Sequence, residues 1–153
     1  MRRRRRQMKK ILWLVPFVFL FTVSYALGAT PVGQWKTIDD ETKQEKSIVE
    51  IYESGGMLFG KIVRLLQEKD GGVNKLCEKC TGADHNKPIV GMVIIKNMKK
   101  EGDEYKGGTI MDPAKGKTYK CILKVSADGS KLEVRGYLGI PTLGKTQVWE
   151  RVK

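Results

Sequence analysis

The sequence predicts an all-β protein, built as a single antiparallel up-and-down barrel of eight strands. Three observations predict it. Apolar and polar residues alternate with period two through most of the chain after residue 30. Short turns rich in glycine separate the alternating runs, and no window there has a long period of 3.6. Successive antiparallel strands with little helix form either a sandwich or a closed barrel, and closure removes the exposed edges that recruit other chains.

The early strands are short and rich in β-forming residues. In order they are Val32–Ile38, Ser47–Glu53, Met57–Leu66, Ile89–Asn97 and Tyr105–Met111. Ser54-Gly55-Gly56 joins the second strand to the third, and a turn from Asp112 to Gly116 follows the fifth. The one long connection, residues 67–88, is of a length that in compact domains is usually functional or tied down.

The clearest alternation lies in the sixth and seventh strands, Lys117–Val125 and Lys131–Leu138. Their predicted inward faces carry Tyr119, Cys121, Leu123 and Val125, then Leu132, Val134 and Leu138. A short turn with Asp128-Gly129 joins them, which predicts a β-hairpin. The eighth strand, Lys145–Val152, closes the chain.

Residues 1–29 have the features of a cleaved secretory signal peptide. Arg2 to Arg6, with Lys9 and Lys10, form an acid-free positive start. The apolar run Ile11–Phe21 is about half the length that spans a bilayer, and small residues follow at Ala26, Gly28 and Ala29. We expect the mature protein to begin near residue 27–30, outside the cytoplasm. An uncleaved anchor is the alternative, disfavoured by Pro16 within the run and by the small-residue exit.

The charge of the predicted mature chain is modest. The leader holds seven of the 29 Lys and Arg and none of the 17 Asp and Glu, which leaves 22 bases against 17 acids, a net charge of +5. The only basic cluster, residues 96–100, is followed at once by Glu101 and Asp103. A nucleic-acid surface requires a sustained basic stripe, so no nucleic-acid partner is expected.

The chain has three cysteines, and two of them, Cys77 and Cys80, lie in the long connection. In an oxidising compartment, Cys77 and Cys80 most simply form a disulfide, which leaves Cys121 as a small buried residue. The alternative ties one of the two to Cys121. A redox role requires a helix N-terminus in a βαβ setting, which the pattern lacks. Cys77, Cys80, His85 and Cys121 are zinc-ligand types, but only one pair has a fixed spacing, so no metal is expected.

Catalytic patterns are sparse. His85 is the only histidine and lies in a polar segment beside Asn86 and Lys87. The acidic clusters fall in turns, and the Gly-Gly pairs lack the strand-to-helix setting of a phosphate loop. We therefore predict no catalytic residues, no cofactor and no enzymatic activity; an enzyme whose site the sequence does not reveal is the least favoured alternative.

Aromatic residues mark the two ends of the predicted barrel. Gly33-Gln34-Trp35 opens the first strand and Trp149-Glu150-Arg151 lies in the last. Closure makes these strands neighbours, so Arg151 can lie across the Trp35 ring in a cation–π contact. We expect Trp35, Arg151 and Trp149 to close one end of the barrel as structural residues.

These motifs resemble those of the lipocalins and fatty-acid-binding proteins, the calycins. More specifically, residues 32–152 resemble a secreted bacterial family of unknown function with a lipocalin-like barrel. The resemblance rests on Gly33-Gln-Trp35, Ile51-Tyr52, Gly60-Lys-Ile62, Cys77-x-x-Cys80, Asn86-Lys-Pro-Ile-Val-Gly91, Gly107-Gly-Thr-Ile-Met-Asp-Pro113, Gly116-Lys-Thr-Tyr119, Arg135-Gly-Tyr-Leu-Gly139 and Thr146-Gln-Val-Trp149. It implies one barrel domain over residues 30–153 and a periplasmic or secreted location, with no established activity.

A barrel of about eight strands is just wide enough to be filled by side chains or to hold one small ligand. We expect this barrel to bind a small, partly apolar molecule as a carrier. The predicted lining residues are Tyr119, Leu123, Val134 and Leu138, with Arg135 or Asp112 as polar contacts at the rim. The alternative is a filled barrel that acts through its surface as an envelope interaction module. The ligand and the oligomeric state stay open.

Overall fold

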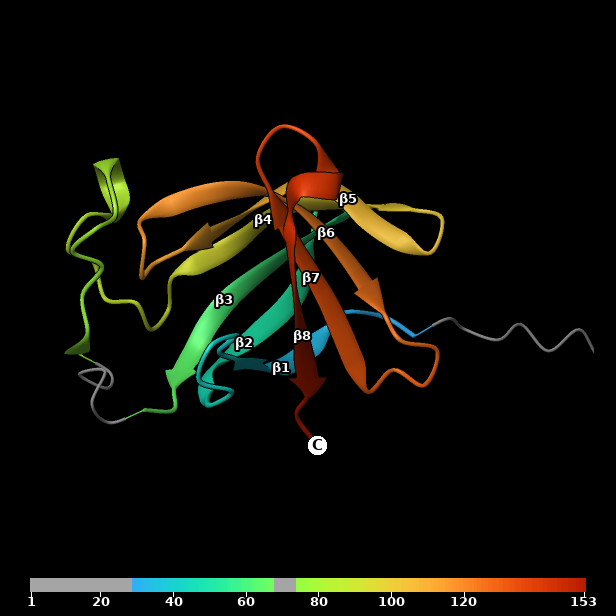
Figure 1. Ribbon diagram of the computed structural model, residues 1–153, viewed down its shortest axis with the longest axis horizontal. Coiled ribbons are helices and arrows are strands. Elements are labelled where there is room, and N and C mark those ends of the chain that lie inside the picture. The colour runs from blue at the N-terminus through green and yellow to red at the C-terminus, as the bar shows by residue number, and fades with distance from the viewer. Residues whose placement is uncertain (1–28, 68–73) are drawn as a thin grey trace, which may run out of the picture.

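The computed structural model describes residues 29–67 and 74–153 as one closed antiparallel barrel (Figure 1). Eight strands follow one another around the barrel in chain order, which confirms the predicted all-β class and topology. They are β1 (Gly33–Ile38), β2 (Glu45–Ser54), β3 (Met57–Leu65), β4 (Val93–Glu101), β5 (Glu104–Asp112), β6 (Lys117–Val125), β7 (Lys131–Tyr137) and β8 (Lys145–Arg151). The predicted leader, apart from Ala29, lies outside the described residues.

The first and last strands complete the closure. Trp35 pairs with Arg151 and Lys36 with Glu150, and the backbone N–H of Val152 donates to the Gln34 carbonyl at 2.9 Å. Figure 1 shows β1 beside β8. Because every strand now has two neighbours, the described sheet has no free edge.

Strand boundaries agree with the predicted ones to within about two residues, except at the fourth strand. The sequence predicts Ile89–Asn97, but β4 begins at Val93. Ile89 instead donates its N–H to the Lys75 carbonyl, and the Met92 N–H bonds back to Ile89, which makes a turn. Ile89 and Met92 are buried within the β3–β4 connection, so their apolar character reflects burial there rather than a place in the strand.

The tightest hairpin joins β2 to β3 through Gly55 and Gly56. Ser54 pairs directly with Met57, which leaves only these two residues in the turn. Both have positive φ, 58° and 75°. A two-residue turn of this kind requires the left-handed region twice, which glycine adopts without steric cost.

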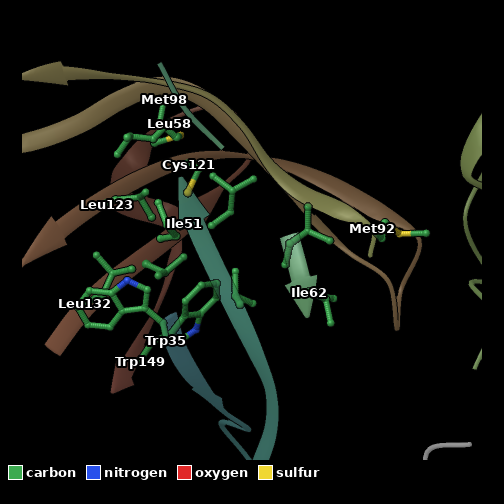
Figure 2. Close-up of a cluster of buried hydrophobic side chains, with 14 of the residues drawn as sticks. Trp35, Ile51, Leu58, Ile62, Met92, Met98, Cys121, Leu123, Leu132 and Trp149 are labelled. Carbon is green, nitrogen blue, oxygen red and sulfur yellow. The ribbon is translucent and has the colours of Figure 1, made fainter. Parts of the chain in front are cut away.

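The buried core occupies one end of the barrel. Figure 2 shows the densest packing around Ile51, with Ile62 and Met92 standing apart from it. The alternation predicted for β6 holds, with Cys121 and Leu123 buried and Lys120 and Lys124 exposed. The packed end contains Trp35, Val49, Ile51, Leu58, Ile95, Met98, Cys121, Leu123 and Leu132.

Candidate functional site

The packed end is closed by Trp35 and Arg151. The Arg151 guanidinium lies 4.1 Å from the centre of the fully buried Trp35 ring, the predicted cation–π contact. The same guanidinium donates to the carbonyls of Thr30, Gly129 and Val32 at 2.6, 2.6 and 3.0 Å. The Trp35 indole N–H donates to the Pro31 carbonyl at 2.7 Å. The segment before β1 is thereby drawn across this end of the barrel.

A cavity of about 960 Å³ fills the opposite half of the barrel. Small-molecule sites usually measure about 300–1,000 Å³ and are mostly apolar with a few fixed polar groups. The β1–β2, β3–β4, β5–β6 and β7–β8 connections surround its mouth, because each contributes residues to the lining. Its apolar wall comes from seven strands: Ile38, Ile62, Leu65, Ile94, Ile110, Tyr119, Val134 and Trp149.

Trp149 forms the boundary between the packed half and the cavity. It is buried and pairs with Leu132 of the core, yet its ring also lines the cavity. Its indole N–H donates to Gln147 Oε1 at 3.1 Å, and Gln147 Nε2 donates to Asp40 Oδ2 at 3.0 Å. This chain of hydrogen bonds connects the cavity floor to the rim.

Polar groups gather on the β1–β2–β8 side of the cavity. The hydroxyls of Thr37 and Ser47, both buried, are hydrogen-bonded to each other at 2.8 Å. Tyr119 of β6 lies across the barrel from β2, and its hydroxyl has no hydrogen-bond partner within residues 29–67 and 74–153. The Tyr119 phenol therefore lies opposite a hydrogen-bonded polar strip, and Tyr137 also lines the cavity.

The rim carries fixed charges of both signs. Hydrogen bonds from the Thr42 backbone N–H and hydroxyl lower the pKa of Asp39 to about 2, and Lys46 Nζ lies 3.6 Å from its Oδ2. Asp112 accepts the Ala114 N–H at 3.0 Å and pairs with Lys115 at 3.8 Å. Lys79 and Lys145 also line the mouth. The Asp39 carboxylate therefore stays ionised through the ordinary pH range.

The disulfide segment forms part of the cavity wall. Cys77 and Cys80 are bonded to each other, as predicted, and Cys121 is a free buried thiol. Cys77 Sγ lies 3.5 Å from the Pro113 carbonyl oxygen, a packing contact because a disulfide sulfur has no proton to donate. Neighbouring Leu76, Glu78, Lys79 and Ile89 line the cavity.

The remaining candidates for zinc binding do not come together. His85 Nδ1 lies 2.9 Å from the Cys80 carbonyl oxygen, and Cys121 lies in the barrel core. Within the described residues, no three His, Cys, Asp or Glu side chains are grouped as metal ligands would be. Burial raises the pKa of the Cys121 thiol to about 12.

The structure places four of the six predicted ligand contacts at the cavity: Tyr119, Val134, Leu138 and Asp112. It corrects the placement of the other two. Leu123 is fully buried in the packed half, below the cavity floor. Arg135 follows the inward Val134 and so points outward, where it donates to the Pro141 carbonyl and Thr146 Oγ1, both at 2.7 Å.

Several lining residues were not predicted, although the alternation carried a signal for some. Thr37 lies two residues after Trp35, and Gln147 two before Trp149, so period two places both on inward faces. Nothing in the sequence pattern indicated that Leu76 and Ile89 of the long connection reach the cavity.

Residues 33–151 match the model of a family described as uncharacterized proteins conserved in bacteria, DUF2147. The chain belongs to this family. The match covers all eight strands, so the family relationship applies to the whole barrel.

A solved structure shares the fold of this DUF2147 protein. It is protein HP1028 from Helicobacter pylori, which is described as belonging to the lipocalin family. The two chains are 24% identical, with a TM-score of 0.71 over 82% of this chain and 84% of the other. At that identity the likeness establishes a lipocalin-like barrel. No significant match to a curated protein was found. In the part of the chain that the structure describes, no helix has the length and apolar character to cross a membrane.

Proposed function

We propose that this protein is an exported barrel that binds a small, partly apolar molecule in its open half, without chemical conversion. One observation carries the proposal: the core does not fill the barrel, and a cavity of about 960 Å³, bordered by the buried Trp149, occupies the rest of its interior. A barrel that acted only through its surface would gain stability by filling this space, because buried voids lose packing contacts.

The distribution of polarity defines the ligand class. The apolar wall suits a hydrocarbon or ring portion, whereas the Tyr119 hydroxyl and the charged rim suit a polar portion. An amphipathic molecule satisfies both. An extracytoplasmic location is part of this proposal, supported by the predicted leader, the bacterial family and the Cys77–Cys80 disulfide.

Gly136 offers a direct test, because it lies on the inner face of β7 and lines the cavity. A Cβ atom there would contact Ile110 and Tyr119 at 3.6 Å, an ordinary packing distance. The ring of Gly136→Phe would therefore project into the cavity without disturbing the backbone. Glu133→Phe is the matched control, since it adds the same ring to the exposed outer face of β7.

The measurement is titration of an environment-sensitive apolar dye into the purified protein. We expect saturable uptake at one site by the natural sequence and by Glu133→Phe, competed by an amphipathic lipid. Gly136→Phe should bind about tenfold more weakly or worse, because the ring occupies the ligand volume. Absence of uptake by the natural sequence, or equal uptake by a folded Gly136→Phe, would refute cavity binding.

A further inference from the structure

The connection between β7 and β8 presents an unusual apolar tip at the mouth of the barrel. Leu138, Ile140 and Leu143 are 63%, 57% and 78% exposed, more than any other large apolar side chain of the described residues. All three fall within six successive positions. Figure 1 shows this connection projecting beyond the strand ends, with the short 3₁₀ turn Pro141–Leu143 (η4) at its base.

The tip is held in place by a dedicated set of hydrogen bonds. Arg135 donates to the carbonyls of Pro141 and Thr142 and to Thr146 Oγ1. The N–H groups of Leu143 and Gly144 bond back to Ile140 and Pro141 at 3.3 and 3.0 Å. The Arg135 guanidinium thus holds the connection in a conformation that keeps Leu138, Ile140 and Leu143 exposed to water. Such an arrangement is preorganised for a surface that covers them, because little ordering entropy remains to be lost.

The surroundings of the tip are positively charged. Residues 134–149 contain Arg135 and Lys145 and no acidic residue. Lys120 lies opposite Tyr137, directly beside the tip, and like Lys145 it is exposed and forms no ion pair with the described residues. All the hydrogen-bond acceptors of Arg135 are neutral oxygens. Asp39, Asp40 and Glu41 lie on the other side of β8, together with Lys43 and Lys46, so the cationic character belongs to the β6–β7–β8 side.

The apolar tip is also continuous with the cavity. Leu138 and Leu143 line the cavity mouth while most of each side chain is exposed. An apolar molecule leaving a bilayer at this point would meet Leu138 and Leu143, which line the mouth, before it reached the cavity wall.

We propose that the β7–β8 tip docks the mouth of the barrel onto an anionic lipid surface. Ile140 and Leu143 would insert among the acyl chains near the headgroups, and Lys120 and Lys145 would lie against the anionic headgroups. A few apolar side chains combined with basic residues are the usual means of reversible interfacial binding. This docking is independent of ligand uptake and stands even if the cavity proves empty.

The test is co-sedimentation with vesicles of phosphatidylcholine alone or mixed with phosphatidylglycerol. The protein is purified as the cells process it, and mass spectrometry checks that all variants share one N-terminus. We expect binding to the anionic vesicles, weakened by salt. Ile140→Ser with Leu143→Ser should reduce partitioning about tenfold or more, whereas Val148→Ser, on the exposed outer face of β8, should leave it unchanged.

A second readout does not depend on how well the serine variant folds. In Leu143→Trp, the added indole should be quenched by brominated lipid, whereas that of Val148→Trp should not. Trp35 and Trp149 are present in both variants, so any quenching of Trp149 by lipid in the cavity cancels when the two are compared. Docking is overturned by any of three results: no vesicle binding, equal binding of neutral and anionic vesicles, or an unquenched Trp at position 143. A lipid-free dimer that the double serine variant abolishes would show that a second copy covers the tip and would equally overturn it.

Discussion

At the scale of single residues, the Trp35–Arg151 contact joins the first and last strands of the barrel. Arg151 supplies one stacked face and three hydrogen bonds, and all of its partners lie in the segment before β1, in β1 itself or in the β6–β7 turn. The closed end of the barrel therefore depends on two side chains more than 100 positions apart in the sequence.

Trp35→Ala should destabilise the protein by roughly 3–5 kcal/mol, because a large, fully buried ring is lost and a cavity remains. Trp35→Phe should cost less, since it keeps a ring beneath Arg151 and loses mainly the hydrogen bond to Pro31. Urea unfolding monitored by circular dichroism gives both values. A cost below about 1 kcal/mol for the alanine variant would contradict the packing of the closed end.

The second residue-scale feature is the Cys121 thiol. Its folded-state pKa is about 12, because burial disfavours the thiolate, whereas a thiol in an unfolded chain ionises near 8.5. Between these values the unfolded state loses a proton that the folded state keeps. The free energy of unfolding should therefore be unaffected below about pH 8 and should fall as pH rises above it.

We expect the stability of the natural sequence to decline by up to about 1.4 kcal/mol per pH unit more steeply than that of Cys121→Ala above about pH 9. Lysines and tyrosines that both proteins share contribute equally to the two slopes of unfolding free energy against pH, so their contributions cancel in the difference. Urea unfolding at a series of pH values measures it. Parallel slopes would show that the thiol ionises as readily in the folded state as in the unfolded one.

At the scale of elements, the disulfide segment is a wall of the cavity supported by the β5–β6 turn. Cys80 Sγ lies 3.7 Å from Met111 Sδ, and Cys77 Sγ contacts the Pro113 carbonyl. Gly116 lies against the Lys79 carbonyl so closely that a Cβ would overlap it. The long connection is therefore held at a defined position by contact with a neighbouring turn.

Gly116→Ala should separate this segment from the turn. Gly116 and Gly102 share the same φ of 65°, but nothing lies within 4 Å of a Cβ built at Gly102. Gly102→Ala therefore measures the backbone strain alone, about 1–2 kcal/mol. Gly116→Ala should cost roughly 1–3 kcal/mol more, because the overlap adds to the strain. Equal unfolding free energies for the two variants would mean that the segment does not rest on the turn.

At the scale of the whole molecule, the barrel is divided into a packed half and an open half. The division follows from closure: the tight connections at one end bring Trp35, Leu123 and Leu132 together, whereas the connections around the other end hold the walls apart. The packed core and the cavity thus lie at opposite ends of the barrel.

The predicted leader gives a prediction at this scale. The exported protein should begin near residue 27–30, and residue 30 should be present because Arg151 donates to the Thr30 carbonyl at 2.6 Å. Intact mass of the protein recovered from the periplasm or the medium measures the N-terminus. Recovery of the full-length mass in the membrane fraction would instead establish an uncleaved anchor.

The amino-acid sequence by itself determined seven of the eight strands to within about two residues, the facing of their side chains, and the contact of Arg151 with Trp35 at the closed end. These are properties of neighbours along the chain: period two places Cys121, Leu132 and Val134 inward wherever the strand lies in the barrel. The pairing of Cys77 with Cys80 could be predicted for the same reason, since the two are close in sequence.

Only the tertiary structure decided which inward residues face the cavity and which lie in the core. Leu123 and Val134 form a cross-strand pair and both point inward, yet one is fully buried in the packed half while the other also borders the cavity. Their environments differ because the other strands place different side chains around each of them along the barrel axis. The register of all eight strands sets those contributions, and Ile89 lies at the cavity wall in the β3–β4 connection rather than in β4. Side-chain alternation is local, whereas a cavity is the space that distant segments leave between them.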